Sequence, residues 1–100
     1  MLNSKQRAKL RSYSNTMAPV FQVGKGGITN EVCKAADMAL EARELIKISV
    51  LETAGITSRQ AADKISEATS SEVVSVIGRR FVIYRMSENI ENRKISKDIL

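Results

Sequence analysis

The chain has 100 residues, 43% of them hydrophobic, and a formal net charge of +5 at neutral pH. This length suits one domain with a modest core, and no apolar run approaches the roughly 18 residues of a membrane span. The single cysteine, Cys33, and the absence of histidine exclude an intramolecular disulfide and His-based catalysis or metal binding. Because the first residues also lack the apolar segment of a secretory signal, we expect a cytoplasmic protein.

The positive charge is concentrated near the N-terminus. The first 30 residues contain no acidic side chain and five basic ones, Lys5, Arg7, Lys9, Arg11 and Lys25. The other eleven of the chain's 16 basic residues are balanced by its 11 acidic residues, all of which follow residue 30. A localised excess of this kind indicates a polyanionic partner, which is usually nucleic acid or an anionic membrane surface.

Two helices and a short strand are expected in the first 43 residues. Residues 3–16 have apolar side chains at helical spacing, with basic side chains along both edges of that stripe. Residues 20–23, Val-Phe-Gln-Val, are predicted to form a short strand. Residues 30–43 repeat apolar side chains on one helical face, and Thr29 is a suitable N-cap for that helix.

A second strand and a third helix are expected next. Residues 44–51 are rich in branched side chains, and Ile46, Ile48 and Val50 share one face while Lys47 and Ser49 share the other. That second face is therefore expected to be at least partly open. Gly55 marks a loop, after which Thr57 or Ser58 can cap a helix that continues to about residue 68.

The third and fourth strands are predicted to form a hairpin. Residues 73–77 and 81–84 are joined by a glycine and two arginines, so Arg79 and Arg80 are expected at the hairpin tip. The whole order is helix, strand, helix, strand, helix, strand, strand. It predicts an α/β fold of the α+β, two-layer type, with three helices and a four-stranded mixed sheet.

The end of the chain offers no chemical motif. Residues 87–100 are polar and mixed in charge, so we expect a mobile or weakly docked tail after a domain of residues 1–86. Glu41 and Glu44 lie at a helix end and are expected on a solvated face. No carboxylates pair at a predicted cleft, so the sequence predicts no catalytic residue, no metal site and no cofactor.

A glycine-rich segment joins the first strand to the second helix. It fails the P-loop pattern, and a dinucleotide fingerprint would need a glycine where Thr29 stands. A G-x-x-G pattern remains, in Gly24, Lys25, Gly26 and Gly27. In KH domains such a loop clamps a nucleic-acid backbone, because glycines admit close approach and N–H groups meet phosphate oxygens. A turn that needs its glycines for steric reasons alone is the alternative.

Four segments of the chain resemble one known family. The segments are Lys5-Gln6-Arg7 with Leu10, residues 19–29, residues 39–47 and residues 76–85. In order and spacing they resemble the CRM domain, the chloroplast RNA splicing and ribosome maturation family, in its single-domain bacterial YhbY type. The resemblance implies a fold similar to the C-terminal domain of translation initiation factor three. It also implies RNA binding through the G-x-x-G loop and adjacent basic surface, on large-subunit ribosomal precursors.

These observations predict a non-catalytic, monomeric RNA-binding protein, with no membrane or small-molecule partner. Its expected ligand is structured RNA, above all ribosomal RNA or a pre-ribosomal particle, held in a salt-dependent manner. A protein-interaction module that uses the open sheet face near Lys47 and Ser49 is the alternative. Arg79 and Arg80 are expected either as a second RNA contact or as a solvated tip. The candidate RNA-binding residues are Lys5, Arg7, Lys9, Arg11, Gly24, Lys25, Gly26, Gly27, Arg79 and Arg80.

Overall fold

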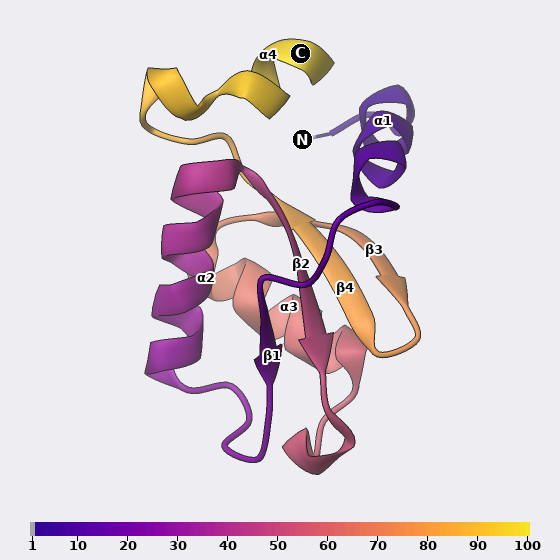
Figure 1. Ribbon diagram of the computed structural model, residues 1–100, viewed down its shortest axis with the longest axis vertical. Coiled ribbons are helices and arrows are strands. Elements are labelled where there is room, and N and C mark those ends of the chain that lie inside the picture. Colours follow the sequence, from indigo (N-terminus) through magenta and orange to yellow (C-terminus); the bar gives the residue numbers. More distant parts are fainter. Residues whose placement is uncertain (1) are drawn as a thin grey trace.

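A computed structural model of the protein describes residues 2–100 (Figure 1). The three main helices and all four strands form where the sequence predicts them, within two residues at each end. The elements are α1 (Ser4–Ser14), β1 (Phe21–Val23), α2 (Asn30–Arg43), β2 (Leu45–Val50), η1 (Glu52–Ala54), α3 (Ser58–Thr69), β3 (Glu72–Ile77), β4 (Arg80–Tyr84), η2 (Ile90–Asn92) and α4 (Lys94–Ile99). Within residues 2–100, no helix is long and apolar enough to cross a membrane.

The four strands form one mixed sheet in the order β1-β2-β4-β3. β1 runs parallel to β2, while β4 is antiparallel to both β2 and β3. The register places Gln22 beside Ser49 and Ser49 beside Arg80. The end of β1, the end of β2 and the β3–β4 hairpin tip therefore lie at the same end of the sheet (Figure 1).

One face of the sheet forms the main core with α2 and α3. Ile46, Ile48 and Phe81 are buried on this face, against Leu40 of α2 and Ile65 of α3. The alternation along β2 produces this arrangement, because every second side chain points to the same face. The fold class and the four-stranded mixed sheet are thus confirmed.

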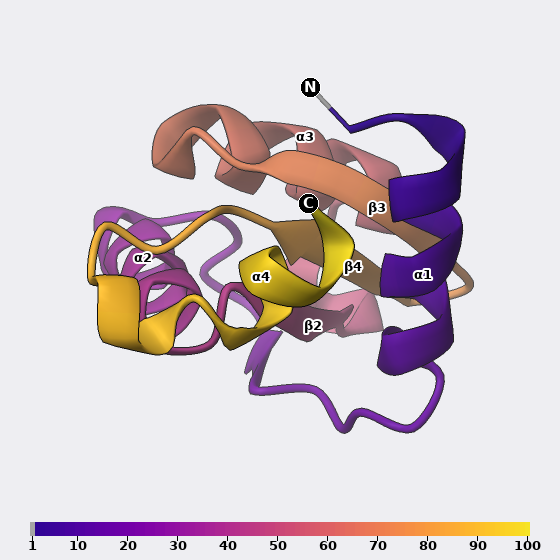
Figure 2. The ribbon, with the colours of Figure 1, turned by 90° about the horizontal axis from the view of Figure 1, so that it is seen from above.

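The opposite face carries a second, smaller cluster. Leu10 of α1 and Ile99 of α4 are buried there with Leu45 and Tyr84 of the sheet. Figure 2 shows α1 on the other side of the sheet from α2. The two-layer description therefore applies to the sheet with α2 and α3, and α1 and α4 add a partial third layer on the face that was expected to be open.

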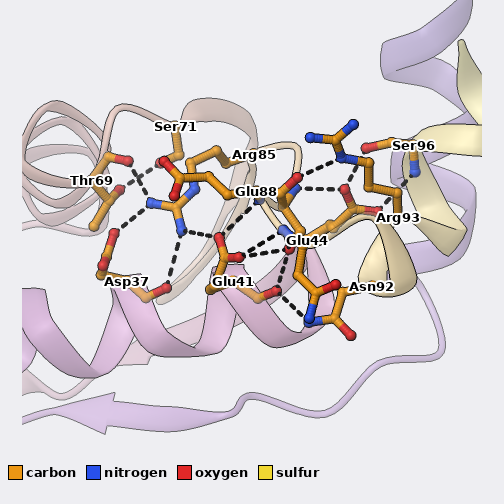
Figure 3. A network of polar contacts seen from close by, with 12 residues as sticks. Asp37, Glu41, Glu44, Thr69, Ser71, Arg85, Glu88, Asn92, Arg93 and Ser96 are labelled. Atoms are coloured by element: carbon orange, nitrogen blue, oxygen red, sulfur yellow. Dashed lines mark hydrogen bonds and ion pairs between the residues drawn. The ribbon is translucent and has the colours of Figure 1, made fainter.

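The last fourteen residues lie against the domain, where the sequence predicts a mobile or weakly docked tail. Their anchor is Glu44, whose side chain is fully buried. Its carboxylate accepts hydrogen bonds from the N–H of Ser87 at 2.7 Å, the N–H of Ser96 at 3.0 Å and the Ser96 hydroxyl at 2.5 Å (Figure 3). The Tyr84 hydroxyl also bonds the Ser96 hydroxyl. Two serines of the tail, Ser87 and Ser96, thus serve this buried carboxylate.

The expectation that Glu41 and Glu44 are both solvated is wrong. Glu41 is half-buried and accepts hydrogen bonds from the N–H groups of Glu88 and Asn89, both at 3.1 Å. Those two bonds, the Ser87 hydroxyl and the nearby Arg85 charge hold the pKa of Glu41 below its usual value. Sequence spacing could not reveal this, because the partners are more than 40 residues away.

Candidate nucleic-acid interface

The glycine-rich segment forms a tight turn directly after β1. The Gly27 N–H donates to the Gly24 carbonyl at 2.9 Å, which leaves Lys25 and Gly26 at the two central, exposed positions. The N–H groups of these two residues donate no hydrogen bond within residues 2–100. The turn therefore presents two free N–H donors and one lysine to the solvent, a combination suited to an anion.

Steric need explains only one glycine of this turn. Gly27 has a φ of +67°, a conformation that other residues rarely adopt. Gly24 and Gly26 do not have φ in that region, and a Cβ added to either would meet only ordinary contacts, at 3.8 Å to Leu51 and 3.7 Å to Thr29. The fold does not require glycine at these two positions, so the steric alternative does not account for them.

Helix α2 begins immediately after the turn. Thr29 caps it, with the Val32 N–H donating to the Thr29 hydroxyl at 3.2 Å. The free N–H groups of a first helical turn favour a negative charge nearby. Glu31 is exposed in that first turn and already supplies one. The helix start therefore adds less to anion binding than the sequence alone suggests.

The β3–β4 hairpin tip lies at the same end of the sheet as the glycine turn. The Leu51 N–H donates to the Val23 carbonyl at 2.9 Å, and the Val50 N–H donates to the Arg79 carbonyl at 2.7 Å. Both arginines of the tip are exposed. The Arg79 guanidinium forms an ion pair with Glu52 at 3.2 Å, so Arg80 is the less restrained of the two.

Helix α1, although it precedes the turn in the sequence, lies towards the opposite end of the molecule. Figure 1 shows α1 near the two termini and the glycine turn at the far end of β1. Arg7 donates to the Val73 carbonyl at 2.6 Å and to Glu72 at 3.2 Å, and Lys9 forms an ion pair with Asp98 at 3.5 Å. The ten candidate residues thus occupy two separate places, with the four glycine-turn residues and the two arginines at one of them.

The remaining basic residues of α1 are not engaged in this way. Lys5 and Arg11 are exposed, and neither forms an ion pair with any residue from 2 to 100. The division arises because α1 packs on the sheet through the face that contains Leu10 and Ser14. Arg7 is one turn before Leu10 and reaches β3, whereas Lys5 and Arg11 remain at the surface.

The aromatic side chains serve the core. Phe81 and Tyr84 are buried, and Phe21 and Tyr13 are partly buried against the two hydrophobic clusters. Burial raises the pKa of the Tyr84 hydroxyl. None of these four rings is an exposed platform on which bases could stack, as the bases do on RRM sheets.

A hollow of about 430 Å³ is lined by Asp37, Glu41, Arg85 and Glu88 among others. Arg85 forms ion pairs with both Asp37 and Glu41 and also donates to the Thr69 carbonyl (Figure 3). These contacts join α2, α3 and the chain after β4, which is a structural role. No group of residues between 2 and 100 has the composition and geometry of a metal site.

The turn, the mixed sheet and the helices on both faces define a small α/β domain with a solvent-facing G-x-x-G turn. A sequence model of the CRS1/YhbY (CRM) domain matches residues 2–85, and the chain belongs to that family. It is 41% identical to Probable RNA-binding protein YqeI of Bacillus subtilis, over 95% of this chain and 97% of that protein. It is 32% identical to a Haemophilus influenzae protein named RNA-binding protein, over 87% of this chain and 88% of that protein.

A solved structure matches the fold as well. The solution structure of a Staphylococcus aureus protein, described as hypothetical and as a candidate for RNA binding, superimposes with a TM-score of 0.73. The two chains are 42% identical, and the match covers 94% of this chain and 98% of the other. The resemblance to the CRM family that the sequence indicates is therefore confirmed.

Proposed function

We propose that the chain is a non-catalytic RNA-binding protein that grips the phosphates of structured RNA through the glycine turn. The observation that carries this proposal is the presence of glycine at positions 24 and 26, where the fold has room for a side chain. Glycine at these positions allows a second molecule to approach the backbone of the turn closely. The RNA-binding names of the relatives, over almost their whole length, support RNA as that molecule.

The glycine turn and the hairpin tip are the centre of the proposed site. The exposed Lys25 and Arg80 supply long-range attraction, while the free N–H groups of Lys25 and Gly26 supply directed hydrogen bonds to phosphate oxygens. Lys5 and Arg11 are proposed as peripheral contacts. Because Arg7 and Lys9 are held by contacts within the chain, we expect them to contribute less.

We further propose ribosomal RNA of large-subunit precursors as the ligand, bound by a monomer in the cytoplasm during ribosome assembly. Contacts to phosphates carry no base information, so sequence preference should be modest. Five exposed cations, each meeting a phosphate, would give a slope of about −4 in a plot of log affinity against log salt concentration. The five are Lys5, Arg11, Lys25, Arg79 and Arg80.

The test replaces Lys25 and Gly26 together with aspartate. We expect the affinity for a large-subunit ribosomal RNA fragment to fall at least about tenfold, or roughly 1.4 kcal/mol, with little change in melting temperature. The matched control is Met38→Asp with Lys64→Asp, which makes the same change of net charge at exposed positions of α2 and α3. Equal affinity losses in both variants, or none in the first, would refute the role of the turn.

A further inference from the structure

The face of the sheet that α1 covers is open at the hairpin end. Helix α1 ends at Ser14, and beyond it a groove of about 180 Å³ remains. We call it the sheet groove, and its walls include Ser14 and Asn15 of the α1 end, Lys47 of β2, Ser75 of β3 and Arg80 of β4. These residues meet because Lys47 and Ser75 both pair with Val82 of β4, two residues from Arg80.

The groove is basic, and the apolar side chains of Ile77 and Val82 complete its lining. Lys47 is half-buried and Arg80 is exposed, and neither forms an ion pair with any residue between 2 and 100. None of the lining residues is acidic. The acidic residue that begins β3, Glu72, lies at the other end of that strand, beside Arg7. Two cations without an acidic neighbour in the groove, together with hydroxyl and amide groups, complement a phosphate chain.

The groove also lies between the two separated groups of candidate residues. One wall is the C-terminal turn of α1, one helical turn after the exposed Arg11. The opposite side of the groove ends at Arg80. Arg80 pairs with Ser49, and Ser49 pairs with Gln22, which lies two residues before the glycine turn. A path along the surface thus runs from the glycine turn, across the hairpin end of the sheet, to α1.

We propose that the sheet groove holds one strand of the bound RNA, with Lys47 and Arg80 each contacting a phosphate. The strand would run from the glycine turn over the groove to Arg11. This inference rests on the proposed function and adds Lys47 to the binding residues. The molecule measures 37 Å along its longest axis. At about 3.4 Å per phosphate along a stacked strand, about eleven nucleotides cover that length.

The test uses two RNA probes with the same stem-loop and a single-stranded 3′ extension of either about four or about twelve nucleotides. The shorter extension matches the four nucleotides that a G-x-x-G loop clamps. The longer one also reaches the groove and α1. We expect the unaltered protein to bind the longer probe about tenfold more tightly. Its salt slope should be steeper by about 2.1, or about 0.7 for each of the phosphates at Lys47, Arg80 and Arg11.

The variant Lys47→Gln with Arg80→Gln should lose most of this gain and about 1.4 of the additional slope, while Lys47→Arg alone should retain both. The control Lys64→Gln with Lys94→Gln removes the same charge from exposed positions away from the groove and should behave like the unaltered protein. Melting temperatures verify that each variant folds.

The two hypotheses fail in different ways. If the unaltered protein binds both probes equally, or the groove variant keeps the gain, the strand does not occupy the groove, and a protein partner becomes the better explanation for this face. If the control loses as much as the groove variant, the effect is net charge alone and the inference is overturned. If the unaltered protein binds neither probe, the proposed function itself fails.

Discussion

The glycine turn yields the sharpest prediction, because the backbone conformation requires glycine at position 27 but not at position 26. In Gly26→Ala the new methyl group meets nothing closer than the Thr29 side chain, at 3.7 Å, and the φ there is not left-handed. An alanine at such a position stabilises a protein by about 0.4–1 kcal/mol, because it restricts the unfolded chain. In Gly27→Ala the φ of +67° costs about 1–2 kcal/mol.

These values translate into opposite shifts in melting temperature. For a domain of this size, 1 kcal/mol corresponds to about 4–8 °C. We therefore expect Gly26→Ala to melt a few degrees above the unaltered protein and Gly27→Ala several degrees below it. If Gly26 admits a phosphate to the turn, its alanine variant should nevertheless bind ribosomal RNA about five- to tenfold more weakly, or roughly 1–1.4 kcal/mol.

Thermal denaturation and an RNA-binding titration at fixed salt measure both effects on the same preparations. Gly24→Ala serves as an internal comparison, because its added Cβ would lie against Leu51 rather than at the exposed tip of the turn. It should raise stability by a similar amount and weaken binding less than Gly26→Ala does. A Gly26→Ala protein that melts higher and keeps full RNA affinity would refute the reasoning, and one that melts lower would show that this glycine is structural after all.

Two further predictions concern the anchored tail. Glu44→Gln should lower the free energy of unfolding by about 1–3 kcal/mol, because an amide cannot accept all the hydrogen bonds that the buried carboxylate receives from Ser87 and Ser96. Denaturant unfolding measures this, and an unchanged midpoint would argue against the anchor. The lowered pKa of Glu41 means that its contribution is fully present above pH 4.5 and declines as the pH falls below that value. Hydrogen exchange of the Asn89 amide should therefore accelerate in acid, beyond the intrinsic effect of pH, in the unaltered protein. The same acceleration should be absent in Glu41→Gln. Equal behaviour of the two proteins would contradict the role of the Glu41 carboxylate.

Local signals in the sequence determined the elements of this protein. Asn3, Thr29 and Thr57 are N-caps that each accept a hydrogen bond from the helix they begin. The alternation along residues 45–50 specified a strand with one buried face. Such signals depend on side chains within a few positions of one another, and for that reason they can be read without a structure. The glycine turn was also visible in this way.

The tertiary structure alone decided which of these elements meet. Lys5 to Arg11 and the glycine turn are neighbours in sequence, yet β1 carries the chain away from α1 before the turn begins. Arg80 is more than 50 residues from the turn and reaches the same end of the sheet, because β2 pairs with both β1 and β4. Glu44 looked solvated because its partners follow 43 and 52 positions later. Strand order and long-range burial depend on contacts between distant residues, which no short window of sequence contains.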